Sequence, residues 1–334
     1  MDVSQTLNEL LQRAGQYHPI YRGGLATHLP MVLMALQGLQ ASKATLMHTF
    51  QTSTDELALI GSLESINAVE DVMFHLGDRS QFKPYLKYFK HQLAMDGADA
   101  VLKRVLPLLM PGLAASAFHA LIRLAYAIEA SHDNEIAIAL AYWCSEFQSF
   151  TLIEQPTNES LDGIFERLAP LGEKYVFSPG IIVDRMSEMA VVLNKGGHRW
   201  QPETLTFSGV RQFCAETFHN QNNFTLLHTV TGCHAFSVIV PYLKDVEHAV
   251  KMLWQAIVIA YLSTGLGYSA GIKFMPKGGE ENIKANFETV IAAARLSREP
   301  HVIKLVYTCL QEYNRYHEPL YLQLAQRAIL GGYD

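Results

Sequence analysis

The stretch from Phe224 to Val240 constrains this chain more than any other part of its sequence. It reads FTLLHTVTGCHAFSVIV, which predicts a helix that is apolar on every side, and such a helix is normally buried inside a large protein. His228 and His234 lie within it. A buried imidazole needs a hydrogen bond or a metal for each ring nitrogen. Six residues at about 100° each separate the two rings by about 240°, so the rings do not share one face of the helix.

The composition predicts a soluble protein with a large interior. Hydrophobic residues make up 49% of the 334 residues and charged residues only 17%, which suffices for one large core or two modest ones. The net charge is -6 and no basic cluster occurs, so nucleic-acid binding has no electrostatic support. The N-terminus lacks the basic-then-apolar pattern of a secretory signal, and apolar runs are interrupted before they reach membrane-spanning length. The four cysteines form no CxxC pair, which predicts buried free thiols in a reducing compartment. We therefore expect a cytoplasmic protein without a membrane partner.

Helical periodicity dominates the chain, and no run alternates with period two for long. We expect an all-α protein with roughly a dozen helices. They should form a single large domain, residues 1–334, with a buried central cavity. The predicted helices span residues 2–14, 29–40, 54–76, 82–94, 96–110, 112–131, 133–144, 156–170, 181–194, 203–219, 224–240, 245–264, 281–296, 300–315 and 317–330.

Two further histidines lie at positions where a site could form. His28 would begin the apolar helix 29–40, with Thr27 as the N-cap residue and Pro30 in the first turn. His119, Arg123 and Tyr126 recur at steps of three or four on helix 112–131, and so share one stripe. A polar stripe on a buried helix is costly unless it lines a site. Each histidine alone is equally well explained as a core residue bonded to backbone, and no spacing matches a diagnostic metal motif such as HExxH.

Lys304 strengthens the functional interpretation. Its neighbours at 302, 303, 305 and 306 are all apolar, which predicts a buried amine, although a snorkelling lysine is the alternative. Desolvation lowers the pKa of an amine, and the neutral amine is nucleophilic. It can pair with a carboxylate, form a Schiff base, or take up CO2 as a carbamate. A carbamate would supply an anionic oxygen ligand beside neutral imidazoles, and His301 would lie close enough to support it.

The remaining histidines and one acidic pair are expected away from any site. Glu280 and Glu281 are interpreted as a solvated pair in a loop. His219 and His248 are intermediate between core and surface. The histidines expected on the surface are His48, His75, His91, His132, His198 and His317.

Four segments together resemble the questin oxidase-like family. They are GGLATHLPMVLMAL from Gly23, FHALIRLAYAIE from Phe118, LHTVTGCHA from Leu227 and EPHVIKLV from Glu299. The similarity extends from residue 20 to residue 315 and is closest in character to shorter bacterial members. The resemblance implies a helical fold. From the fungal members it also implies oxidative cleavage of anthraquinone-type polyketide rings with O2, at a non-haem iron centre of histidines with a carboxylated lysine.

The resemblance also implies a set of ligands. Carried over by motif, His28, His119 and His228 match histidine ligands, and Lys304 matches the lysine. The fourth histidine is assigned to His234, with His248 and His301 as alternates. Fungal members have longer loops, so their substrate is not carried over to this chain.

We therefore expect a metal-dependent oxidoreductase, a non-haem iron oxygenase that acts with O2 on a flat apolar or aromatic substrate. Fe(II) is the expected metal, with Zn as the alternative, and no motif supports NADPH as a reductant. Arg123 and Tyr126 would orient an oxyanion or ketone of the substrate. Two alternatives stay open: a metal-dependent hydrolase that uses the same residues, and a helical protein that only binds an apolar ligand. The sequence fixes neither the substrate nor the oligomeric state.

Overall fold

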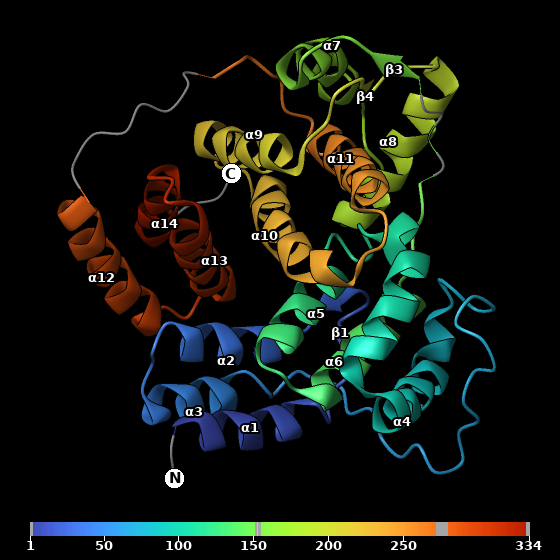
Figure 1. Ribbon diagram of the computed structural model, residues 1–334, viewed down its shortest axis with the longest axis vertical. Coiled ribbons are helices and arrows are strands. Elements are labelled where there is room, and N and C mark those ends of the chain that lie inside the picture. Colours follow the sequence, from blue (N-terminus) through green and yellow to red (C-terminus); the bar gives the residue numbers. More distant parts are fainter. Residues whose placement is uncertain (1–2, 151, 153–154, 272–279, 332–334) are drawn as a thin grey trace.

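The computed structural model describes residues 3–150, 152, 155–271 and 280–331 (Figure 1). Helices dominate these residues, and the only sheets among them are two pairs of two-residue strands, so the predicted all-α class is confirmed. The helices are α1 (Val3–Ala14), α2 (Leu29–Gly38), α3 (Lys43–Thr52), α4 (Phe82–Leu109), α5 (His119–Glu129), α6 (Asp133–Ser145), α7 (Leu161–Glu173), α8 (Ile182–Gly196), α9 (Phe207–Gln221), α10 (Phe224–Ile239), α11 (Val246–Leu262), α12 (Glu280–Leu296), α13 (Pro300–Tyr316) and α14 (Leu320–Leu330). The strands are β1 (Ile20–Tyr21) with β2 (Leu25–Ala26), antiparallel, and β3 (Pro156–Thr157) with β4 (Gln201–Pro202), parallel. Short 3-10 helices are η1 (Arg79–Gln81), η2 (Met110–Gly112) and η3 (Val240–Tyr242).

Helix α10 lies in the middle of the molecule (Figure 1). It packs against α5 on one side, α13 on another, and α9 and α11 on the rest of its surface. Helix α2 packs on both α5 and α13, and so closes the group from below in the view of Figure 1. One continuous apolar core includes side chains from α1 through α14. The four helices α2, α5, α10 and α13 therefore form the centre of this core.

The central helix α10 is buried along almost its whole length, as the apolar sequence predicts. Asn223 caps it, since the side-chain oxygen accepts from the backbone N–H groups of Thr225 and Leu226. Gly232 lets α5 approach, because a Cβ at this position would lie only 3.1 Å from the ring of Phe118. With η3, the helix is long and apolar enough to cross a membrane, but 78% of that window is buried within the molecule. This is the pattern of a core helix in a soluble protein.

One predicted helix is wrong and one observed helix was not predicted. Residues 54–76 form turns and bends, not a helix. Side chains there bond neighbouring backbone, as Ser62 Oγ does with the N–H of Glu64 and Asp71 Oδ1 with the N–H of Met73, and Gly61 has a φ of +74°. Such local bonds compete with helix formation. The helix α3 was missing from the predicted set.

Smaller differences affect boundaries. The predicted helices 82–94 and 96–110 are both present within α4, and they meet at Gly97, whose φ of 76° and ψ of 163° are not helical. Glu280 and Glu281 were predicted in a loop, but they begin α12.

His132 was predicted on the surface, but it is buried and its Nδ1 accepts from the N–H of Glu135 at the start of α6. The four cysteines are free and buried, as predicted.

Candidate metal centre

Four helices begin close to one point in the core, and each brings one histidine there. His28 is the N-cap residue of α2, His119 is the first residue of α5, and His301 is the second residue of α13. His228 lies in the second turn of α10. We refer to these as the four-histidine cluster. The N-terminal end of a helix carries a partial positive charge, about +0.5 of an elementary charge, so the position favours anions and disfavours protonated imidazoles.

The hairpin before α2 positions His28. Strands β1 and β2 are joined by Arg22, Gly23 and Gly24, which all have positive φ, as a tight turn requires. Thr27 follows β2, and its hydroxyl donates to the backbone oxygen of His18 at 2.9 Å. Contrary to the prediction, Thr27 is therefore not the N-cap residue of α2. That position belongs to His28, whose side chain makes no capping bond and is free to face the other histidines.

A strained turn positions His119. Ser116, Ala117 and Phe118 have φ values of 51°, 52° and 68°, in the left-handed region that non-glycine residues seldom adopt. Neighbouring contacts hold this turn, including a 2.6 Å bond from the Tyr142 hydroxyl to Ser116 Oγ. Strain of this kind persists only where the surrounding structure fixes it, and it often marks functional sites.

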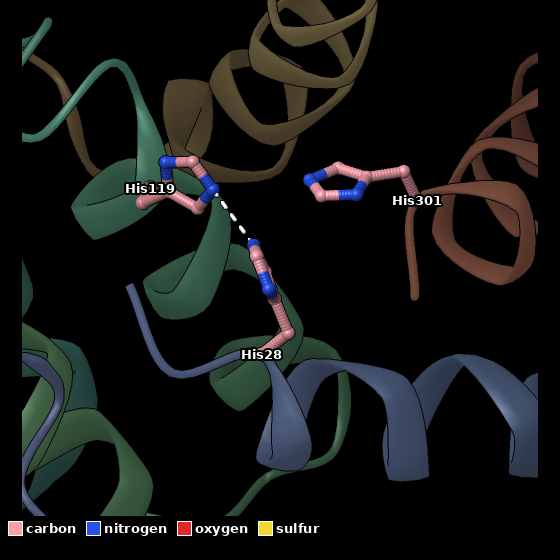
Figure 2. Close-up of side chains that lie close together, drawn as sticks. All are labelled: His28, His119 and His301. Carbon is pink, nitrogen blue, oxygen red and sulfur yellow. Dashed lines mark hydrogen bonds between the residues drawn. The ribbon is translucent and has the colours of Figure 1, made fainter. Parts of the chain in front are cut away.

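The rings of the cluster face one another. His28 Nε2 and His119 Nε2 lie 2.9 Å apart, and one nitrogen from each of His28, His119 and His301 falls within 4.8 Å of the other two (Figure 2). The His228 ring is adjacent, with its centroid 4.7 Å from that of His119 and 5.4 Å from that of His301. Two nitrogens that each bind one ion at about 2.0–2.1 Å, at right angles, lie about 3 Å apart. The spacing of His28 and His119 is of this size.

Hydrogen bonds at Nδ1 fix the tautomer of three rings. His119 Nδ1 lies 2.8 Å from the Ser116 carbonyl oxygen, and His228 Nδ1 lies 2.9 Å from the Phe224 carbonyl oxygen. His301 Nδ1 lies 2.7 Å from a carboxylate oxygen of Glu299. Carbonyl and carboxylate oxygens only accept, so each Nδ1 carries the proton and each Nε2 presents a lone pair. This is the usual outer-shell arrangement of metal-binding histidines.

The Nε2 atoms of His228 and His301 are buried and have no hydrogen-bond partner in the described structure. Buried polar atoms are seldom left without a partner, so this pair calls for a ligand or a water. Burial lowers the pKa of His28, His119 and His228 well below the usual value and that of His301 to about 4, with the neighbouring cationic groups adding to the effect. The cluster is therefore neutral at physiological pH, which is the form that binds metals.

Lys304 is 1% exposed and lies on α13 one turn after His301. Burial lowers the pKa of its amine to about 7, so a large fraction is neutral near pH 7. The amine is close enough for its charge to lower the pKa of all four histidines of the cluster. Its burial beside the cluster agrees with the predicted arrangement, and its carbamylation stays a prediction. Among the described residues, His28, His119 and His301 form a group whose ring nitrogens could hold one metal ion, and His228 and Lys304 lie beside it.

His234 lies apart from the cluster. Its Nδ1 pairs with Glu312 Oε1 at 2.9 Å and its Nε2 with Glu129 Oε1 at 3.4 Å, so both ring nitrogens face carboxylates. The assignment of His234 as fourth histidine does not fit these contacts. His301, which was an alternate, has a ring nitrogen within 4.8 Å of ring nitrogens of His28 and His119, whereas the other alternate, His248, is exposed at the start of α11.

The three side chains of the predicted stripe on α5, His119, Arg123 and Tyr126, contact different parts of the structure. His119 faces the cluster, whereas Arg123 pairs with Glu135 of α6 at 2.8 Å, both side chains being buried. Tyr126 donates to the backbone oxygen of Lys304 at 3.4 Å and its ring lies 5.2 Å from that of Tyr307. The stripe is buried, but its members do not face one cavity, so the substrate-orienting role predicted for Arg123 and Tyr126 has no support in these contacts.

Two open clefts reach the cluster from the surface. One, of about 790 Å³, is largely apolar, and its lining includes Phe224, Leu296, Val302, Ile329 and His301. The other, of about 900 Å³, is more polar and includes His28. Leu296 and Ser297, at the junction of α12 and α13, line both clefts and separate them. The central cavity predicted from the sequence stays a prediction.

The fold and the site define an all-helical protein with a histidine-rich candidate metal centre. Residues 25–167 match the model of the family described as questin oxidase-like. This match supports the resemblance found in the sequence and suggests an oxidoreductase. The matched range includes His28 and His119, whereas His228, His301 and Lys304 follow it. No curated protein matches the chain.

Proposed function

We propose that this protein is a non-haem iron oxygenase, with Fe(II) held by the four-histidine cluster. The observation that supports this most strongly is the pair of buried Nε2 atoms on His228 and His301, which have no partner and lie beside the close pair of His28 and His119. Iron in such a site supplies redox chemistry with O2. The protein's part is to hold the ligands, exclude water and admit the substrate.

His28 is the ligand that must change its protonation. In the absence of metal, His119 Nε2 has no proton, so His28 Nε2 donates to it across 2.9 Å. Metal binding would require a lone pair on His28 Nε2, so the proton would move to Nδ1 and give the other neutral tautomer. His28 lines the polar cleft, so water reaches this ring.

Lys304 is proposed to complete the site as a carbamate. The neutral amine attacks the carbon of CO2, an N–C bond forms, and one proton leaves to solvent. The product is an anion, which is costly in an apolar setting unless a cation pairs with it. The converging helix N-termini favour this negative charge, and the divalent metal balances it. Carbamate and metal should therefore stabilise each other.

The apolar cleft is proposed to admit a flat aromatic substrate. Its volume, about 790 Å³, lies within the range of about 300–1,000 Å³ that is typical of small-molecule sites. Phe224 lines it and stacks edge-on against His301 and His228, with ring centroids 4.6 and 5.0 Å away. An aromatic ring bound there would lie against Phe224, next to His301.

The test is to load the metal-free protein with Fe(II) without oxygen, measure bound iron, and add nitric oxide as a probe of an open coordination position. We expect one iron per chain and the electron paramagnetic resonance signal of an iron–nitrosyl complex. His119→Ala should abolish both, whereas His132→Ala, which removes a buried histidine outside the cluster, should keep both. Tight binding of zinc with no iron–nitrosyl signal would instead favour the hydrolase alternative.

A further inference from the structure

Away from the four-histidine cluster, helices α5, α10 and α13 also contact one another through a group of charged and aromatic side chains. We define the ion-pair cluster as Glu129, His234, Tyr307 and Glu312. Glu129 ends α5, His234 lies in α10, and Glu312 and Tyr307 lie in α13. Each of these three helices also carries one histidine of the four-histidine cluster, and nothing in the proposed function uses the second group.

The contacts of the ion-pair cluster run between helices. His234 bridges Glu312 at 2.9 Å and Glu129 at 3.4 Å, and so joins α10 to both α13 and α5. The Tyr307 hydroxyl donates to the other oxygen of Glu129 at 3.0 Å, which joins α13 to α5 directly. His234 and Glu312 are 7% and 2% exposed, so little solvent screens the pair.

Helix α2 meets the same group. Gly38, its last residue, lies against Tyr307 so closely that a Cβ would fall 2.3 Å from the ring. Tyr307 also packs on Tyr126 of α5, with ring centroids 5.2 Å apart. All four elements that supply a cluster histidine are therefore in contact through one set of side chains at a distance from the histidines themselves.

The geometry points to a positioning role: the ion-pair cluster sets the relative placement of α5, α10 and α13, and thereby the spacing of His119, His228 and His301. Apolar contacts between helices tolerate small slides, whereas a buried ion pair with two fixed partners is lost when one helix shifts. Burial of unpaired charge is costly, so the paired register is preferred.

The charges around His234 are consistent with an imidazolium. The carboxylates of Glu129 and Glu312 outweigh the effect of burial and raise the pKa of His234 to about 9. From α9, Arg211 Nε lies 4.0 Å from Glu312 Oε2, and Arg211 also pairs with Glu318. Two cations, His234 and Arg211, and three carboxylates thus surround α10, with one negative charge in excess.

Two tests are possible, and only the second, which uses Co(II), depends on the proposed metal site. The first test uses the metal-free protein and follows the ring nitrogens of all histidines by two-dimensional 1H–15N spectra. In His234→Gln we expect the resonances of His119, His228 and His301 to move. The matched control is Glu146→Gln, which breaks the ion pair between Arg79 of η1 and the buried carboxylate of Glu146 at the end of α6, where no cluster histidine lies. It should leave those resonances in place.

The second test measures Co(II) uptake and its visible ligand-field spectrum. We expect His234→Gln to weaken Co(II) binding at least about fivefold and to change the band pattern, with Glu146→Gln unchanged. If His234→Gln does not fold, Glu129→Gln, whose side chain is 27% exposed, should show the same changes to a smaller extent. Parent-like ring resonances in the folded variants would overturn the inference. Failure of the parent to bind Co(II) would overturn the metal function, while the nitrogen spectra would still decide the positioning role.

Discussion

Glu299 contacts His301 twice: one carboxylate oxygen accepts from the ring Nδ1 at 2.7 Å and from the backbone N–H at 3.1 Å. The residue thus caps α13 and fixes the tautomer and orientation of a proposed ligand at once. Pro300 between them suits the first helical position, where its missing N–H costs nothing.

Glu299→Gln should weaken metal binding about 10–100-fold, because outer-shell partners of ligand histidines contribute that much. An amide oxygen still accepts, but it is a weaker partner than the carboxylate. Isothermal titration with Co(II) checks the loss. Asp245→Asn, which changes the capping carboxylate of α11 in the same way, is the control and should bind as the parent does. Equal affinities in Glu299→Gln and the parent would remove Glu299 from the site.

Lys304→Met should stabilise the metal-free, bicarbonate-free protein and weaken metal binding. The folded pKa of about 7 lies below the ordinary 10.5, so the folded state pays for a charged amine below pH 7. The gain should be on the order of a few kcal/mol below pH 7 and should fade as pH rises from 7 to 10.5. Denaturant unfolding at several pH values measures it. A pH-independent difference would show that Lys304 reaches solvent.

Restoring bicarbonate gives a second measurement on Lys304. With 13C-labelled bicarbonate and Zn(II), the parent should show a carbamate carbon resonance, and Lys304→Met should not. The resonance should weaken as the pH falls, because the amine recharges and the proton released by carbamylation is returned. A resonance that persists in Lys304→Met would come from another amine.

The metal-free protein should lose stability in acid. Folding lowers the pKa of each cluster histidine, so the unfolded chain binds more protons than the folded protein between the two pKa values. For His301 this window runs from about 4 to the ordinary 6.5, and the pKa values of the other three also lie well below 6.5. Stability should therefore fall as pH drops below 6.5. Replacing His228 by Gln should flatten the dependence, and an unchanged slope would contradict the buried neutral ring.

Gly38→Ala should cost about 1–3 kcal/mol of folding free energy, because the added methyl overlaps the Tyr307 ring in the tightly packed core. Gly163→Ala in α7 is the control. A Cβ there meets nothing closer than 3.4 Å, so the helix gains about 0.5–1 kcal/mol. Urea unfolding of both variants checks the opposite signs. A stabilised Gly38→Ala variant would mean that Tyr307 moves aside freely.

Ala293→Phe should block the apolar cleft. The residue lines that cleft from α12, and a larger side chain there takes up room beside Phe224 and His301. Binding of a neutral naphthalene dye, followed by fluorescence, should weaken at least about tenfold, which corresponds to about 1.4 kcal/mol. Thr49→Phe fills the polar cleft instead and should leave the dye affinity unchanged. If Thr49→Phe weakens dye binding and Ala293→Phe does not, the substrate site would instead be the polar cleft beside His28.

The sequence predicts the helices well where apolar periodicity and capping agree. Helix α10 is the clearest case, with Asn223 as its cap and apolar residues on all sides. Residues 54–76 show the limit, since their apolar spacing resembles a helix while Ser62 and Asp71 bond the backbone locally. The left-handed turn before His119 contains no glycine, so the sequence gives no signal for its positive φ values, and the turn depends on packing.

The site was predicted in part. His28, His119, His228 and Lys304 come from the recognised motifs, and the structure places them together. The angle of about 240° between His228 and His234 already indicated that one helix face could not serve both. His301 was harder to assign because a histidine at the start of a helix is common. The order Glu-Pro-His was the available signal, since it gives the ring a carboxylate partner two residues away.

The spread of the cluster along the chain has a consequence for biosynthesis. His28 and His119 both precede residue 200. Helices α6 to α9 lie between His119 and His228 in the chain, and α11 and α12 lie between His228 and His301. A nascent chain that ends before α13 therefore carries at most three of the imidazoles, and it lacks the lysine as well. The full set of donors is assembled only after the last helices have been made and docked, when slow, long-range contacts close. We therefore expect the proposed metal to bind with its full set of ligands only after α13 has been made and has docked.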